Sequence, residues 1–129
     1  MGYFPVFFDI SSKDILVVGA GEVATRRVLT LIEFCGNIHV ISPSITPILR
    51  ELFEANKISY SQKKFCKEDI ISPFLVLATT DDKDLNQEIV NICKQKNILV
   101  NNACDRKSCD FYFPAIAVIG LILSQKKEY

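Results

Sequence analysis

The sequence predicts an α/β domain built on a doubly wound parallel sheet, with strand order 3-2-1-4-5 and helices on both faces. Three observations predict this fold. Short apolar runs alternate with segments of helical periodicity, a Gly-Ala-Gly turn follows the first run, and no internal repeat or low-complexity linker interrupts the alternation. The 129 residues, 49% of them hydrophobic, are enough for one domain with a buried core.

The first half of the chain predicts three strands and two helices. Ile15–Val18 is short, apolar and followed by glycines, which is typical of a buried parallel strand. Glu22–Phe34 spaces its apolar residues at helical intervals. The strand Asn37–Ile41 stops where a Ser-Pro pair follows, because proline disfavours its continuation. A helix over Thr46–Ala55 and a weaker strand over Ile58–Gln62 complete this half.

The second half predicts two more strands around one helix. Phe74–Ala78 is a strongly apolar strand, and the polar turn TTDDKD follows it. An amphipathic helix over Leu85–Lys94 leads to a strand over Ile98–Asn101, and either Asp81 or Asp82 is placed to cap that helix. In this topology the ligand crevice lies outside the carboxyl ends of strands 1 and 4.

Composition and charge exclude several function classes. The 15 basic residues balance the 15 acidic ones, so we predict neither nucleic acid nor an anionic membrane as a partner. No apolar run reaches the roughly 18 residues that a membrane span needs. Five cysteines without a CxxC pair favour the reducing cytoplasm. Cys104 and Cys109 lack the further ligands of a metal site, so no metal is predicted.

The turn from Gly19 to Ala24 fits the dinucleotide-binding pattern GxGxxA. The first glycine allows the tight turn, Gly21 lets the backbone approach a pyrophosphate, and the small Ala24 lets the helix pack near the strand. The following helix N-terminus offers N–H groups and a positive dipole end to phosphates. The alternative is a tight strand–helix turn without a ligand.

One feature of a common NAD site is missing. An acid at the end of strand 2 usually binds the ribose hydroxyls, but no acid lies between Glu33 and Glu51. No arginine stands at the strand end to hold a 2′-phosphate either. Ser42, Ser44 or the backbone beside Pro43 can contact the ribose instead. Spacing alone therefore leaves NAD and NADP as alternatives.

Four further residues lie at or near the predicted crevice. Thr80 follows strand 4 and can hydrogen-bond a cofactor. Asp105 follows strand 5, where a carboxylate can accept a proton or hold a cationic pyrrole nitrogen, or simply form a turn. Arg106 and Lys107 form either a solvated basic turn or a contact for substrate carboxylates. His39 lies in mid-strand and is interpreted as structural.

Four segments together resemble a known family, and they occur in the family's order from about residue 3 to residue 120. The chain is similar to the siroheme-synthase N-terminal family, the precorrin-2 dehydrogenases, some of which also act as sirohydrochlorin ferrochelatases. The segments are YFPVFFDISSKDILVVGAGEVATRR, ISPSITPILREL, FLVLATTDDKDLNQEI and VNNACDRKSCDFYFPAIAVIG.

The resemblance implies a Rossmann domain that binds NAD and oxidises precorrin-2 to sirohydrochlorin. It also implies a homodimer. In the family, the aspartate matching Asp105 acts in proton removal and in metal insertion. The NAD contacts fall on Glu22 and Val23 after the glycine turn, on Pro43 and Ser44 after strand 2, and Thr80 lies in the matching turn. The missing strand-2 acid is shared with the family, which favours NAD.

We expect residues 1–114 to form the NAD-binding domain and residues 115–129 to begin a C-terminal region that is otherwise absent. Family members continue past FPAIAVIG into a dimerisation region that helps to build the tetrapyrrole cleft, whereas this sequence ends with GLILSQKKEY. We therefore expect a C-terminally truncated chain. The alternative function is a non-catalytic or degenerate NAD-binding module that lacks the substrate region.

Overall fold

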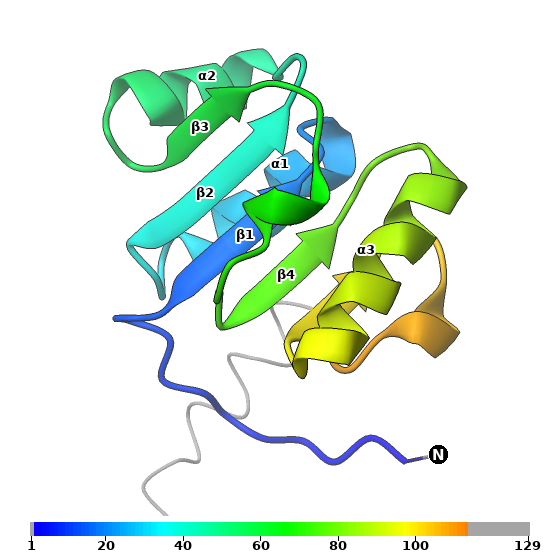
Figure 1. The fold of residues 1–129 in the computed structure, drawn as a ribbon. Helices are drawn as coiled ribbons and strands as arrows, with labels where there is room; N and C mark the ends of the chain where they lie inside the picture. Colours follow the sequence, from blue (N-terminus) through cyan, green and yellow to red (C-terminus); the bar gives the residue numbers. More distant parts are fainter. Residues whose placement is uncertain (1, 114–129) are drawn as a thin grey trace, which may run out of the picture.

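The computed structural model describes residues 2–113 and shows a five-stranded parallel sheet of order β3-β2-β1-β4-β5, which confirms the predicted topology (Figure 1). The strands are β1 (Asp14–Val18), β2 (Asn37–Ser42), β3 (Ser59–Gln62), β4 (Leu75–Ala78) and β5 (Leu99–Asn102). The α-helices are α1 (Glu22–Leu31), α2 (Pro47–Glu54) and α3 (Lys83–Lys96), and two short 3-10 helices are η1 (Lys67–Asp69) and η2 (Arg106–Ser108).

Side-chain alternation along β1 builds a core on each face of the sheet. Ile15 and Val17 belong to the cluster packed under α1 and α2, whereas Leu16 and Val18 belong to the cluster under α3. This follows from the two-residue period of a strand, which sends successive side chains to opposite faces. Figure 1 accordingly shows α3 in front of the sheet and α1 behind it, so helices cover both faces as predicted.

Two helices differ from the sequence prediction by more than one residue at an end. The helix α1 ends at Leu31 instead of Phe34, because Leu31 accepts the N–H groups of Phe34 and Cys35 in a closing turn. The helix α3 is longer than predicted at both ends. The Asp82 carboxylate caps its start by accepting the N–H groups at helix positions 2 and 3, and Asn97 ends it in a left-handed conformation, φ 57°.

The connection between β3 and β4 contains only the short helix η1, where a doubly wound fold often places a full helix. The face of β2 and β3 on that side of the sheet is therefore left partly open. Within residues 2–113, none of the helices combines the length and apolar character that crossing a bilayer requires. The predicted domain boundary at residue 114 and the C-terminal region of residues 115–129 lie outside the described residues.

Candidate functional site

The turns that follow β1, β2, β4 and β5 meet at the carboxyl edge of the sheet. The N–H of Gly19 donates to the end of β2 at 2.9 Å, and that of Thr79 donates to the end of β1 at 2.9 Å. The N–H of Ala103 donates to the end of β4 at 3.0 Å. These bonds join the turns into one continuous rim. The predicted residues on this rim are Gly19, Gly21, Ser42, Thr80 and Asp105.

The two glycines of the first turn meet different constraints. Gly19 has φ +105°, and a Cβ there would lie 2.8 Å from the Thr79 hydroxyl and 2.9 Å from the Thr80 backbone nitrogen. The fold itself therefore requires glycine at position 19. Gly21 has an ordinary φ of −91°, and a Cβ there would meet nothing within 4 Å. The space in front of Gly21 is open, as the approach of a pyrophosphate requires.

The helix α1 begins without an internal cap. Its N-cap is Gly21, and within residues 2–113 no side chain accepts a hydrogen bond from the first turn. By contrast, the Thr46 hydroxyl caps α2 at 3.3 Å and the Asp82 carboxylate caps α3. The first N–H groups of α1 are thus available, together with the positive dipole end, to an anionic ligand. Glu22 is exposed and Val23 half-buried at this end. The residues present fit a dinucleotide.

A pair of threonines that the sequence analysis did not identify braces this turn. The Thr25 hydroxyl donates to the Gly21 carbonyl at 2.7 Å, and its oxygen lies 2.8 Å from the Thr46 hydroxyl. Because the Thr25 proton is used on Gly21, Thr46 is the donor in the second bond. The brace links the glycine turn to the start of α2, which adjoins the predicted ribose contacts. Each threonine on its own resembles an ordinary helix residue, so only their contact reveals the pair.

The end of β2 carries serines and a proline where an acid is common. Ser42 is half-buried, and its carbonyl accepts the Tyr60 hydroxyl at 2.8 Å and the Lys63 N–H at 3.2 Å. Pro43 and Ser44 are exposed beside it. The Lys63 ammonium does not face this end freely, because Asp69 holds it at 2.6 Å.

The turn after β4 is fixed by a buried amide. Thr80 is half-buried, and its hydroxyl donates to the Asn86 side-chain oxygen at 2.6 Å. Asn86 is 0% exposed and also reaches the Cys104 sulfur at 3.2 Å. Asn86 was not among the residues predicted from the sequence. Its signal was an amide within the apolar stripe of α3, three residues before the buried Ile89.

Asp105 lies exposed at the carboxyl edge, as the N-cap of η2. Its carboxylate accepts the Lys107 N–H at 3.0 Å and the Ser108 hydroxyl at 2.9 Å. Both the predicted turn-forming role and a role towards a ligand are compatible with this placement. Arg106 and Lys107 are exposed next to it, and the Arg106 guanidinium lies 5.1 Å from the Tyr112 ring centroid.

The cysteines near this edge are thiols in different surroundings. Cys109 is buried, and burial raises the pKa of its thiol. Its sulfur accepts the Asn102 N–H at 3.2 Å, whereas Cys104 is exposed. Within residues 2–113, no three His, Cys, Asp or Glu side chains gather as metal ligands would.

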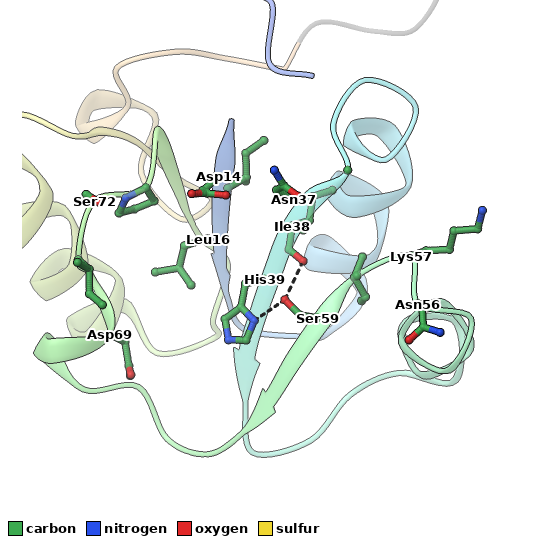
Figure 2. A pocket seen from close by; sticks show the side chains of 15 residues that line it. Asp14, Leu16, Asn37, Ile38, His39, Asn56, Lys57, Ser59, Asp69 and Ser72 are labelled. Carbon is green, nitrogen blue, oxygen red and sulfur yellow. Dashed lines mark hydrogen bonds between the residues drawn. The ribbon is translucent and has the colours of Figure 1, made fainter. Parts of the chain in front are cut away.

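A hollow of about 680 Å³ lies at the opposite, amino-terminal edge, under the uncovered face of β2 and β3 (Figure 2). Both ring nitrogens of His39 are used there by hydrogen bonds, to Ser59 at 2.6 Å and Ser61 at 2.9 Å, as a structural role requires. Burial lowers the pKa of His39, although the Asp69 carboxylate acts in the opposite direction. The hollow is open and contains none of the predicted site residues. The carboxyl edge therefore remains the candidate site.

The sheet topology, the glycine turn and the uncapped helix α1 define a Rossmann-type dinucleotide-binding domain. The chain belongs to the family described as "Putative NAD(P)-binding", which matches residues 6–115.

Two relatives show the same similarity at the level of sequence. A protein of Ruminiclostridium josui named "Probable multifunctional siroheme biosynthesis protein HemA" is 41% identical, covering 98% of this chain and 25% of its own length. A siroheme synthase of Zymomonas mobilis is 41% identical over 96% of this chain and 27% of its own length. The resemblance predicted from the sequence is confirmed. The chain spans about a quarter of the length of the relatives it matches.

A solved structure named "SirC, precorrin-2 dehydrogenase" shares the fold. Its TM-score is 0.78 at 26% sequence identity, and the similarity covers 88% of this chain and 55% of the other.

Proposed function

We propose that this chain is a precorrin-2 dehydrogenase, which uses NAD to oxidise precorrin-2 to sirohydrochlorin in siroheme biosynthesis. The similarity to siroheme synthases and to a named precorrin-2 dehydrogenase supports this substrate. The observation that carries the cofactor assignment is Gly21. It has neither a strained φ nor a packing neighbour that would require glycine, yet it stands at the uncapped start of α1.

Different residues along the rim bind different parts of the cofactor and of the substrate. The backbone at Gly19, Gly21, Glu22 and Val23 holds the pyrophosphate, whereas Ser42, Pro43, Ser44 and Thr80 contact the remainder of the dinucleotide. When bound, NAD supplies the hydride acceptor. Removing a hydride from precorrin-2 leaves a proton to be released, and the exposed Asp105 carboxylate accepts it. Arg106 and Lys107 beside it offer cations to the carboxylates of the macrocycle.

We infer that NAD, and not NADP, is the cofactor. A 2′-phosphate needs a cation near the end of β2, and the basic residue bonded to that end through its backbone is Lys63. Its ammonium is already paired with Asp69 at 2.6 Å. The ribose hydroxyls of NAD need only hydrogen-bonding partners, which Ser42 and Ser44 provide.

The role of Asp105 is tested by the substitution Asp105→Asn. Asparagine keeps an oxygen for the Lys107 N–H, and its NH2 group can donate to the Ser108 hydroxyl, but it cannot accept a proton, so turnover of precorrin-2 should fall by about 100-fold or more. The dissociation constant for NAD should change by less than about threefold, because the turn carries no cofactor contact. Stopped-flow absorbance and NAD titration measure the two quantities. Asp81→Asn, exposed on the neighbouring turn, is the matched control. Equal loss of turnover and NAD affinity would contradict this role.

Two further parts of the predicted function remain proposals from the resemblance. Ferrochelation at Asp105 is one, and a homodimer is the other.

Exposed aromatic side chains in the N-terminal segment, among them Phe4 at 81% and Phe7 at 63% exposure, offer apolar surface to a second copy. Light scattering on the purified chain should give twice the monomer mass. A single-chain mass at every concentration would count against the dimer.

A further inference from the structure

The Asn86 side chain joins two turns of the rim that are far apart in the sequence. Its oxygen accepts the Thr80 N–H at 3.2 Å and the Thr80 hydroxyl at 2.6 Å. Its nitrogen donates to the Thr80 carbonyl at 2.9 Å and to the Cys104 sulfur at 3.2 Å. Asn86 is 0% exposed. Both the oxygen and the NH2 group of the Asn86 amide are therefore hydrogen-bonded to these two turns.

No other side chain of this size supplies the same pattern. The arrangement needs an acceptor that faces Thr80 and two N–H donors that face a carbonyl and a sulfur, which is the chemistry of an amide. An ionised carboxylate would place an acceptor against the Thr80 carbonyl, and an apolar side chain would leave the partly buried N–H and carbonyl of Thr80 without this partner. The buried asparagine on α3 thus supplies the acceptor and the two donors that the two turns require.

Two further hydrogen bonds fix the turn that contains Cys104. The Cys104 N–H donates to the Asn102 side-chain oxygen at 2.9 Å, and the Asp105 N–H donates to the Asn102 carbonyl at 3.3 Å. Asp105 follows Cys104 directly in the chain. The bond from Asn86 to the Cys104 sulfur therefore ties the turn that carries Asp105 to the turn that carries Thr80.

We propose that Asn86 is a positioning residue that sets the Asp105 turn relative to the Thr80 turn, and so aligns the proton acceptor with the cofactor. The alignment rests on the proposed function, whereas the coupling between the turns does not depend on it. Asn86 lies buried in α3 and acts through Thr80 and Cys104.

The coupling is tested by hydrogen exchange on the variant Asn86→Asp, with the exposed Asn91→Asp on the same helix as control. Near neutral pH, an ionised Asp at position 86 cannot donate to either turn. Amides in residues 79–82 and 102–105 should exchange about tenfold faster together, while the strands keep their protection. At lower pH, the buried carboxyl becomes protonated and regains a donor, so the difference from the control should shrink.

A second variant covers the case in which Asn86→Asp fails to fold. Cys104→Ala removes an exposed side chain whose sulfur accepts from Asn86 and lies 3.7 Å from the Thr80 carbonyl, but it leaves the bonds between Asn86 and Thr80 in place. Exchange should then rise in residues 102–105 and stay unchanged in residues 79–82. Unchanged exchange at both turns in this variant, or faster exchange confined to residues 79–82 in Asn86→Asp, would overturn the proposal.

An activity measurement separates this proposal from the proposed function. In Asn86→Asp at neutral pH, kcat for precorrin-2 should fall by about tenfold or more, and NAD affinity should weaken by a smaller factor, because Thr80 is one of several proposed cofactor contacts. Loss of NAD affinity without loss of kcat would contradict the alignment. If the unsubstituted chain lacks turnover, the proposed function fails, and the exchange experiment still decides whether Asn86 couples the turns.

Discussion

Gly19 and Gly21 are separated by one residue but are glycine for different reasons. A side chain at Gly19 would collide with the turn after β4 at 2.8 Å, in a backbone conformation with φ +105°. A side chain at Gly21 would point into open space with φ −91°. The first glycine therefore serves the fold, and the second is available to serve a ligand.

This difference predicts opposite outcomes for two alanine substitutions. Gly19→Ala should lower the free energy of unfolding by about 2 kcal/mol or more, because backbone atoms must shift to admit the methyl group. Gly21→Ala should leave that free energy within about 0.5 kcal/mol but weaken NAD binding at least about tenfold. Urea unfolding and NAD titration check both. If the Gly21→Ala variant binds NAD as tightly as the unsubstituted chain, the cofactor does not bind at this turn.

The role of a side chain could be predicted where it depends on neighbouring residues in the sequence. It could not be predicted where it depends on a partner far away in the sequence. The glycine turn and a helix cap from Asp81 or Asp82 follow from neighbouring residues, so the sequence predicts them, and the structure shows that Asp82 is the cap. Asn86 is partnered by Cys104, 18 residues away, and Thr25 by Thr46, 21 residues away. No periodicity in one sequence specifies such pairs.

At the scale of elements, strand positions were predicted more closely than helix ends. Strands are short apolar runs with clear breakers, and β1, β2 and β4 each lie within one residue of the prediction at either end. Helix ends depend on caps and closing turns. The bond from the Phe34 N–H to the Leu31 carbonyl, three residues back, tightens the last turn where α1 ends, and Asn97 in the left-handed region ends α3 after Lys96.

The short helix η1 makes a pH-dependent contribution to stability through Asp69. Burial raises the pKa of its carboxyl, but hydrogen bonds from Lys63 at 2.6 Å and from the Cys66 N–H at 2.8 Å outweigh it, so the pKa lies below its usual value. A lowered folded-state pKa stabilises the fold above the unfolded-state pKa of about 3.9 and loses that stabilisation as the pH falls through the folded value.

The free energy of unfolding should therefore decline below about pH 4, and the Asp69→Asn variant should show a shallower decline. Urea unfolding at a series of pH values measures the slope. Glu68→Gln, which removes an exposed acid from the same helix, is the control and should keep the slope of the unsubstituted chain. Equal slopes for Asp69→Asn and the control would show that this ion pair contributes nothing.

For the whole molecule, the strand order explains why residues as far apart in the sequence as Gly19 and Asp105 lie at one edge of the sheet. The carboxyl ends of parallel strands all lie at the same edge of the sheet. The order of the strands runs one way from β1 to β3 and the other way from β4 to β5, and the crevice opens between β1 and β4. This arrangement was predictable from the alternation of elements. The substrate was not predictable from the fold, because Rossmann domains serve many reactions. It rests on the family resemblance and on the relatives that share it.

The most direct test of the account follows the absorbance of precorrin-2 mixed with the purified chain and NAD. The account predicts conversion to sirohydrochlorin with the appearance of NADH in equal amount, dependent on both NAD and the protein. It further predicts that NADP supports the conversion more weakly. Saturable NAD binding without any sirohydrochlorin would contradict the dehydrogenase assignment and leave a nucleotide-binding module.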